Sequence, residues 1–343
     1  MASAIELRGV SKSFRGRASQ GGLSGALRSL LRARYYEVHA VEELSFQIEA
    51  GERVAFVGPN GAGKSTTIKM LSGVLYPTRG EIEVLGLVPW RDRRALGYEI
   101  GTVFGQRSRL WLHLPAGDTF DLLAQVYDLD GGAYRRRRDE LIDAFGIGGL
   151  VAKPVRHLSL GERMRCELVA SLLHRPSILF LDEPTIGLDV VAKATLRDLV
   201  RELSERDGST VLLASHDTGD MERVCDRVLV IHGGRLLLDR GLDELRRTFI
   251  RRKVVTLLSA DERIEVEMAG VAVVSRLPHR VVLEVDTERT KIEAVVQAVL
   301  STSRLQDISV EDPPMEEIVQ AIYTRAGALA GTGAGVVAAG GAP

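Results

Sequence analysis

The segment 58–66, GPNGAGKST, combines residue types that hold phosphate groups. It fits the pattern GxxxxGK[ST], in which glycines let backbone N–H groups wrap the phosphates. An apolar strand pattern at 53–57 precedes it and a helical pattern begins at about 64, so a helix N-terminus adds positive potential. We expect Lys64 to neutralise the β- and γ-phosphates and Ser65 to hold Mg²⁺ through its hydroxyl. The candidate nucleotide-binding residues of this loop are Gly58, Pro59, Asn60, Gly61, Ala62, Gly63, Lys64, Ser65 and Thr66.

Two acids end a second apolar strand pattern, in the segment ILFLDEP at 178–184. Asp182 suits the Mg²⁺ shell, directly or through water. Glu183 suits a general base aimed at the attacking water. Plain surface polarity is the alternative, but four apolar residues precede the pair and the chain already carries a phosphate loop. Together these residues indicate a P-loop ATPase.

Residues 158–162, LSLGE, open a helical pattern shortly before the acidic strand. They resemble the LSGGQ signature of ABC ATPases, with Leu160 replacing the first glycine and Glu162 the glutamine. The resemblance implies that Ser159 and Gly161 bind a γ-phosphate through a hydroxyl and a backbone N–H at a helix start.

Other ABC elements follow the family order, over about residues 4–248. Gln106, after a strand pattern at 100–104, resembles the Q-loop glutamine that contacts Mg²⁺ and water. Gly187-Leu188-Asp189 resembles the D-loop, and Asp189 joins the nucleotide-binding candidates. His216, after the strand pattern 210–214, resembles the switch histidine that contacts the γ-phosphate. The implied catalytic set is Glu183, His216 and Gln106; the implied metal ligands are Ser65, Gln106 and Asp182.

Adenine recognition in this family usually uses an aromatic side chain just after the first strand. An insert at about 15–38 divides that region here. Phe14 matches when counted from the first strand, and Tyr35, which we favour slightly, when counted back from the next. Either could instead be a core aromatic. Within the insert, leucines at helical spacing opposite arginines predict a basic amphipathic helix, packed on lipid headgroups, on a partner or on its own domain.

The elements that position these residues alternate between strand and helix, which indicates an α/β domain. We expect a mixed sheet at about 4–248, with a helical subdomain set into it at about 107–173. Near 250 the pattern changes. Strands at 253–258, 281–286 and 306–311 and helices at 289–300 and 314–325 predict a small α+β domain over 250–325, and the Gly/Ala-rich tail from 327 predicts disorder.

Composition narrows the function classes. The formal net charge is -1, which gives no global bias toward nucleic acid, and we expect no nucleic-acid partner. Cys166 and Cys225 lie in no metal-ligand pattern and are expected to be buried thiols. No apolar run is long enough to span a membrane and no signal peptide is evident, so we expect a partner to supply the membrane-spanning part.

The family resemblance also implies partners. In ABC proteins the signature of one nucleotide-binding domain closes over ATP held by another, and this chain has one of each motif. We therefore expect a head-to-tail homodimer with two ATPs and Mg²⁺, because every motif looks competent. An apolar loop at 107–114, RSRLWLHL, is expected to receive a permease helix, with local packing as the alternative.

The finer resemblance is to ATPases of ABC-2-type exporters, the class that includes daunorubicin exporters. It rests on the segment 159–193 around the signature and on 307–318, DISVEDPPMEEI. It implies an exporter ATPase at the cytoplasmic face of the cell membrane, bound to a separately encoded permease. The alternatives are an importer ATPase, a soluble ABC ATPase acting on nucleic acid or ribosomes, and a regulator that binds ATP without cleaving it.

Overall fold

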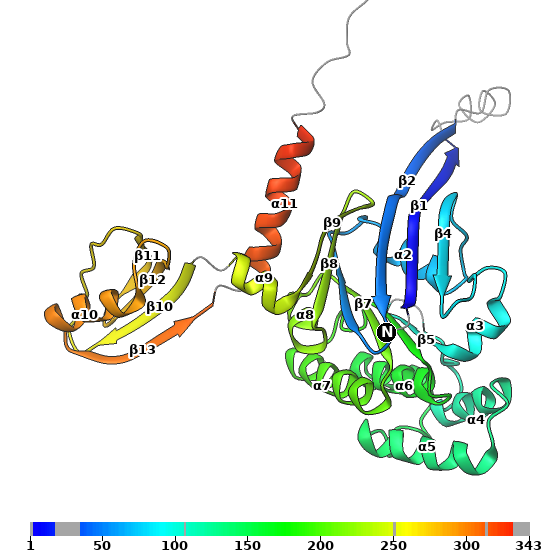
Figure 1. The fold of residues 1–343 in the computed structure, drawn as a ribbon. Coiled ribbons are helices and arrows are strands. Elements are labelled where there is room, and N and C mark those ends of the chain that lie inside the picture. The colour runs from blue at the N-terminus through cyan, green and yellow to red at the C-terminus, as the bar shows by residue number, and fades with distance from the viewer. Residues whose placement is uncertain (1–2, 18–34, 106–107, 250–251, 313–314, 332–343) are drawn as a thin grey trace, which may run out of the picture. The chain divides into compact units, whose positions relative to one another are not determined.

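The computed structural model describes residues 3–17, 35–105, 108–249, 252–312 and 315–331 (Figure 1). It divides into two compact units, Met1–Arg240 and Gly241–Pro343. The division falls at Gly241 and not near 250, so helix α9 (Leu242–Phe249) groups with the C-terminal unit.

The larger unit is built on a six-stranded sheet in the order β5-β6-β7-β3-β8-β9. Its strands are β3 Arg53–Val57, β5 Ile100–Phe104, β6 Ile178–Asp182, β7 Thr210–Ser215, β8 Arg227–His232 and β9 Arg235–Gly241. The first five in spatial order run parallel. Val54 and Phe56 pack in the main core, and the alternate residues Ala55 and Val57 are equally buried. A sheet covered on both faces favours such continuous apolar strands.

A second, antiparallel sheet has the order β2-β1-β4. Its strands are β1 Ser3–Arg17, β2 Tyr35–Glu49 and β4 Arg79–Val84. Their inward residues share one core with the six-stranded sheet and with helix α2 (Lys64–Leu71). The rings of Phe46 in β2 and Phe56 in β3 meet in this core, with centroids 5.8 Å apart.

The remaining helices of this unit occur along the chain in the connections that lead from one strand to the next. They are α3 Arg93–Glu99, α4 Ala116–Val126, α5 Gly131–Ala144, α6 Leu160–Leu172, α7 Val190–Asp207 and α8 Thr218–Val224, with a 3₁₀ turn at Val155–His157. Helices α4, α5 and α6 contact one another and occupy most of the predicted helical subdomain. Helix α6 also contacts β5, which ties this subdomain to the sheet.

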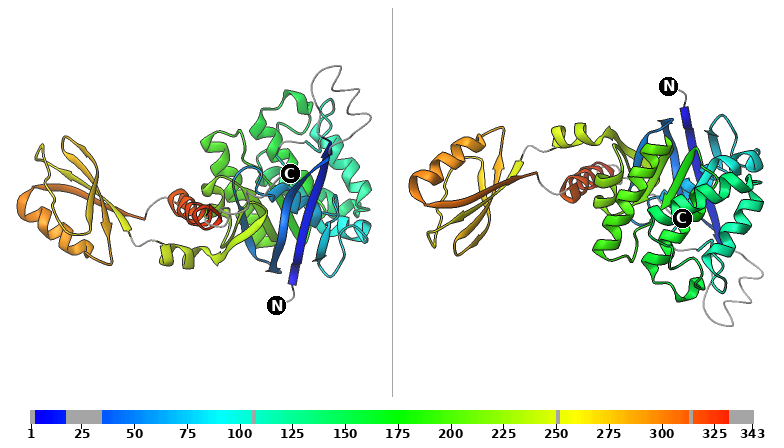
Figure 2. Two further views of the ribbon diagram at one scale, coloured as in Figure 1. Left: turned by 90° about the horizontal axis from the view of Figure 1, so that it is seen from above. Right: turned by 90° about the horizontal axis from the view of Figure 1, so that it is seen from below.

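The C-terminal unit contains a four-stranded antiparallel sheet in the order β11-β12-β10-β13. Its elements are β10 Arg252–Ser259, β11 Val271–Leu277, β12 Arg280–Asp286, α10 Ile292–Thr302, β13 Leu305–Glu311 and α11 Met315–Gly331. Helix α10 lies along one face of the sheet, where Val295 and Val299 join the core formed by Val255, Leu257 and Leu283 (Figure 2). This is the small α+β fold that the sequence predicts.

The bounds of the insert and of the last helix differ from the expected ones. The insert at 15–38 is narrower, because β1 continues to Arg17 and β2 begins at Tyr35; Arg15 pairs with Glu37 across the hairpin. The predicted amphipathic helix falls mainly on 18–34, outside the described residues. At the other end α11 continues to Gly331, past the predicted end at 325. Its alanines favour helix, which the Gly/Ala-rich composition concealed.

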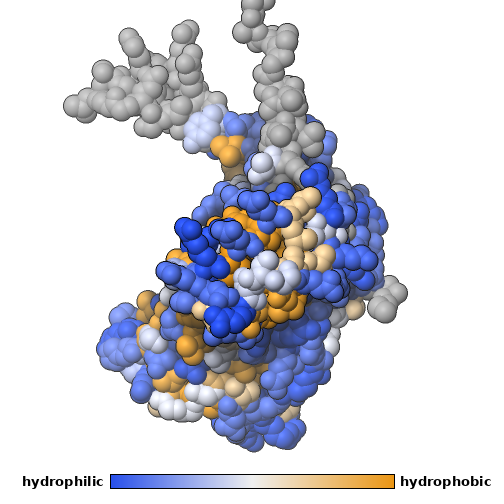
Figure 3. All heavy atoms as spheres, turned by 90° about the vertical axis from the view of Figure 1, so that its left-hand side faces the viewer, coloured by the Kyte–Doolittle hydropathy of each residue, from blue (hydrophilic) through white to orange (hydrophobic). Residues whose placement is uncertain are grey.

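In the part of the chain that the structure describes, no helix is long and apolar enough to cross a membrane. On the face shown in Figure 3, hydrophilic side chains separate the apolar surface into patches.

Candidate functional site

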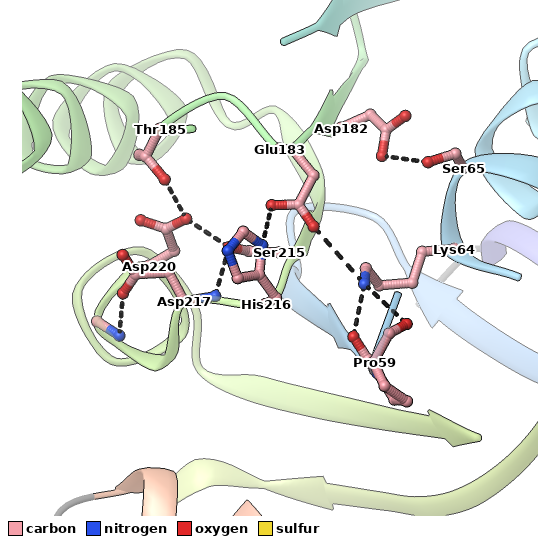
Figure 4. Close-up of polar contacts among 12 residues, drawn as sticks. Pro59, Lys64, Ser65, Asp182, Glu183, Thr185, Ser215, His216, Asp217 and Asp220 are labelled. Atoms are coloured by element: carbon pink, nitrogen blue, oxygen red, sulfur yellow. Dashed lines mark hydrogen bonds and ion pairs between the residues drawn. The ribbon is translucent and has the colours of Figure 1, made fainter. Parts of the chain in front are cut away.

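The predicted phosphate loop joins β3 to α2, and Lys64 is the first residue of the helix. Gly63 caps the helix with a φ of 105°, and a Cβ there would lie 2.5 Å from the carbonyl oxygen of Ala40. Only glycine fits this turn. Lys64 is buried, and its ammonium donates to the carbonyl oxygens of Gly58 at 2.5 Å and Pro59 at 3.4 Å (Figure 4).

The phosphate loop forms the floor of a cavity of about 470 Å³. The cavity also receives residues from β2 and from the ends of β6 and β7. The lining residues outside the loop are Val38, His39, Ala40, Glu183, Ile186 and His216. The fold therefore brings the predicted loop, base and switch histidine around one space.

The acid pair stands where β6 ends. Asp182 accepts a hydrogen bond from the Ser65 hydroxyl at 2.9 Å. Burial raises the pKa of Asp182, against the hydrogen bond from Ser65, which lowers it. The backbone here is pinned on both sides: the N–H of Gly105 donates to the Asp182 carbonyl, and the N–H of Glu183 donates to the Ala214 carbonyl, each at 2.8 Å. Two neighbouring strand ends thus fix the acids.

Glu183 connects the phosphate loop to the switch histidine. One carboxylate oxygen lies 2.6 Å from Nδ1 of His216, and the other lies 3.6 Å from the Lys64 ammonium (Figure 4). A carboxylate only accepts, so Nδ1 of His216 carries the proton. The Glu183 side chain is largely buried, whereas His216 is half exposed. The pair can orient a water molecule and accept its proton beside the phosphate loop.

The LSLGE segment lies at the N-terminus of α6. Ser159 is the N-cap and accepts from the Glu162 N–H, while the Glu162 carboxylate accepts from the Ser159 N–H at 2.8 Å. This reciprocal capping box lowers the pKa of Glu162, chiefly through the Ser159 N–H. Glu162 thus performs the acceptor role that a glutamine would have at this position.

The signature segment and the D-loop line a separate cavity of about 620 Å³. It contains Ser159, Leu160, Gly161, Gly187 and Asp189. The Asp189 carboxylate caps α7 by accepting from the Ala192 N–H at 2.9 Å. Among the described residues, none lines both this cavity and the phosphate-loop cavity, although the chain passes from one to the other between Ile186 and Gly187.

The adenine-stacking candidates give a mixed result. Phe14 is exposed, and the Lys12 ammonium lies 5.2 Å from the centroid of the Phe14 ring. Phe14 does not line the phosphate-loop cavity. Tyr35 begins β2, and its side chain lies outside the described part of the chain, as does Gln106. His39 does line the cavity and shares a hydrogen bond with Ser13; sequence reasoning missed it because it belongs to no motif.

Comparison with known proteins agrees with this geometry. Residues 41–186 match the family described as ABC transporter. The chain is 37% identical over 213 residues to the daunorubicin resistance ATP-binding protein DrrA3 of Streptomyces coeruleorubidus, covering 62% of this chain and 67% of that one. It is 31% identical over 208 residues to the ABC transporter ATP-binding protein NatA of Bacillus subtilis, covering 61% and 84%. This chain belongs to the ABC transporter ATP-binding family.

A solved ATP-binding subunit of an ABC transporter is similar in fold to the part of this ABC protein that it covers. The match has a TM-score of 0.59 and 28% identity, and it covers 72% of this chain and 93% of the other. The chain is therefore an ATP-binding subunit and an ATPase, as the motifs predict. The expected fold class, an ABC ATPase domain with a mixed arrangement of strands, is confirmed.

Proposed function

We propose that this chain powers a membrane exporter as a head-to-tail homodimer with two Mg-ATP between its subunits. The observation that carries the dimer is the separation of the two cavities. One contains the phosphate loop and base, the other the signature and D-loop, and in the part of the chain that the structure describes they share no lining residue. A γ-phosphate held by Lys64 meets Ser159 and Gly161 only if a second copy supplies them.

The residues beside the phosphate loop fit a magnesium ion. Ser65 and Asp182 place a hydroxyl and a carboxylate oxygen 2.9 Å apart, and both are oxygen donors that Mg²⁺ accepts. Among the described residues no cluster of three or more histidine, cysteine or acidic side chains forms a protein-only metal cage. That suits Mg²⁺, which usually takes one or two protein ligands together with substrate phosphates. When bound, the ion would neutralise charge on the phosphate oxygens.

The chain's own residues then divide the work of hydrolysis. Lys64 and the loop backbone bind the phosphates, and Asp182 orients the Ser65 hydroxyl. Glu183 accepts the proton of the attacking water, and His216 holds its carboxylate from the other side. Gln106 is proposed to reach the same water. These roles distinguish a hydrolysing ATPase from a regulator that only binds ATP.

The loop after β5 supports a docking role toward the permease. Glu167 of α6 anchors it by accepting from the Arg109 N–H at 3.0 Å, and Arg109 donates to the Thr102 carbonyl at 2.9 Å. Beyond this anchor the apolar side chains of Trp111, Leu112 and Leu114 are 48%, 45% and 39% exposed. A held loop that presents apolar side chains is typical of a partner surface.

The export direction rests on the relatives. DrrA3 is named for daunorubicin resistance, and we extend the drug-export class to this chain. In this architecture the cargo contacts the permease, so the ATPase carries no substrate site of its own. The proposed location is the cytoplasmic face of the membrane, peripherally bound.

Purification of the tagged chain from its native membrane tests the proposal directly. We expect a polytopic membrane protein to co-purify, and Trp111→Asp to remove it while the isolated chain keeps its ATPase rate within about twofold. Leu300→Asp, an exposed apolar residue of α10, is the matched control and should leave co-purification unchanged. Recovery of the same membrane partner with Trp111→Asp would contradict the docking surface.

A further inference from the structure

The carboxylate of Asp220 in α8 is fully buried and receives hydrogen bonds from three side chains, two of which are drawn in Figure 4. One oxygen accepts from the hydroxyls of Thr185 and Ser215, each at 2.6 Å. The other accepts from Nε of Arg197 in α7 at 2.7 Å. Burying a charged group is costly unless it is paired and hydrogen-bonded, and here both oxygens are.

The two hydroxyls belong to residues beside the proposed catalytic pair. Thr185 follows Glu183 by two positions, and Ser215 immediately precedes His216. Ser215 also accepts from the N–H of Asp217, at 3.0 Å. One carboxylate thus restrains the segment after Glu183 and the segment before His216.

The other side of His216 is restrained as well. The Asp217 carboxylate accepts from the Lys193 ammonium at 2.6 Å and from the Gly219 N–H at 3.0 Å. The guanidinium of Arg197 lies close to Gly219, 2.9 Å from where a Cβ would stand, so α7 and α8 approach closely here. The switch segment is therefore tied to α7, the helix that Asp189 caps at the signature cavity.

Asp220 itself does not line the phosphate-loop cavity. We propose that Asp220 is a positioning residue for hydrolysis: through Thr185 and Ser215 it holds Glu183 and His216 in the 2.6 Å contact. The inference rests on the roles proposed for Glu183 and His216. A positioning residue of this kind affects the chemical step and leaves nucleotide binding intact, because its side-chain hydrogen-bond partners Thr185, Ser215 and Arg197 lie outside the phosphate loop.

Asp220→Asn tests this on the full chain, with ATPase kinetics in Mg-ATP. One amide cannot reproduce both carboxylate oxygens, and its NH₂ group opposes either Arg197 or the two hydroxyls. We expect kcat to fall about tenfold or more, with KM for ATP and binding of a fluorescent ATP analogue within about twofold. Asp198→Asn is the matched control: Asp198 joins the same helices through Arg223, at 2.5 Å and 3.0 Å, but at the surface, and its removal should leave kcat unchanged.

A second pair of variants separates positioning from folding. Thr185→Val removes the hydroxyl and should lower kcat in the same way, and Thr185→Ser should restore it. These decide the matter if Asp220→Asn fails to fold. Three results would each overturn the inference. The first is an unchanged kcat in Thr185→Val, and the second is a loss of ATP affinity that accompanies the loss of kcat. The third is a loss of kcat in the controls Thr185→Ser and Asp198→Asn as large as that in Thr185→Val and Asp220→Asn. A parent chain without ATPase activity would instead contradict the proposed function.

Discussion

Glu183 adopts a backbone conformation that non-glycine residues rarely take, with φ of 54°. Such a conformation costs about 1–3 kcal/mol and persists only where the surroundings enforce it. The hydrogen bond from the Glu183 N–H to the Ala214 carbonyl is part of that enforcement, and Gly105 leaves the room for it, because a Cβ there would lie 2.1 Å from the Glu183 carbonyl oxygen. The strained residue is therefore aimed by its neighbours, which is consistent with a carboxylate whose direction matters for chemistry.

Replacing Glu183 by glutamine removes a base while nearly preserving its shape. General-base loss typically costs about 10²- to 10⁴-fold in rate, and we expect kcat to fall in that range. Mg-ATP binding should survive, because Lys64 and the loop backbone remain. Asp182→Asn is the contrasting variant and should also weaken nucleotide affinity. Turnover and calorimetric titration measure both. A Glu183→Gln rate within a few-fold of the parent would move the base role toward His216.

At this scale the sequence predicts residues that belong to spaced motifs. Lys64, Ser65, Glu183 and His216 each belong to a short motif whose members lie within a few positions of one another, and the fold gathers these motifs around one cavity. Asp220 belongs to no such motif. Its importance arises from complete burial among donors up to 35 positions away in the chain, which only the tertiary structure creates.

Helix α6 offers a prediction about its capping box. Glu162→Ala removes the acceptor for the Ser159 N–H and should lower the free energy of unfolding by about 1 kcal/mol. Glu162→Gln keeps an acceptor and should stay close to the parent, since glutamine also forms this motif. Urea unfolding at neutral pH measures the difference. Equal stability of the alanine and glutamine variants would show that the box contributes nothing.

His174, two residues after the end of α6, makes a pH-sensitive contact. Desolvation lowers the pKa of His174 to about 4, and its Nε2 donates to the Ile100 carbonyl at 3.1 Å while its ring stacks on Tyr127. In the unfolded chain histidine titrates near pH 6.5, so between about 6.5 and 4 only the unfolded state gains the proton. His174 thus contributes stability that is full above about pH 6.5 and is lost as pH falls toward 4.

We therefore expect acidification from pH 7 to 5 to destabilise the parent more than His174→Phe. The phenyl ring can keep the stack on Tyr127 and cannot titrate. The difference should approach about 2 kcal/mol, measured by urea unfolding at each pH. His157→Gln, an exposed histidine, is the control and should follow the parent. Parallel pH profiles for His174→Phe and the parent would contradict the assignment.

Strands were predicted correctly where an apolar run is bounded by turn residues such as glycine. They were missed where strand pairing in the folded sheet, and not the local sequence pattern, defines the strand. Strand 53–57 matches β3 in full. The strand β8 and its neighbour β9 were not predicted, although Gly233-Gly234 between two apolar runs is a hairpin signal. The edge strand β11 is mostly exposed, so it lacks the alternation that marks a half-buried strand.

The whole molecule should change its association state with nucleotide. We expect the isolated chain to be mainly monomeric without ATP, because the proposed interface assembles around charged phosphates. With Mg-ATP the Glu183→Gln variant should accumulate as a dimer, since ligand that bridges two copies stabilises them together. Light scattering with and without Mg-ATP measures the mass. A dimer in both conditions would indicate a separate interface, for example through residues 250–325.

The separation of the two cavities makes genetic complementation possible between two inactive variants. Lys64→Ala damages only the phosphate-loop half of a site, and Ser159→Arg only the signature half. In a mixed dimer both defects fall in one composite site, and the other site is assembled from two undamaged halves. Random mixing should leave about a quarter of all sites intact. Hydrolysis recovered to about a quarter of the parent rate would mean that one intact site hydrolyses ATP independently of the other. No recovered hydrolysis would mean that both sites must be intact for either ATP to be cleaved.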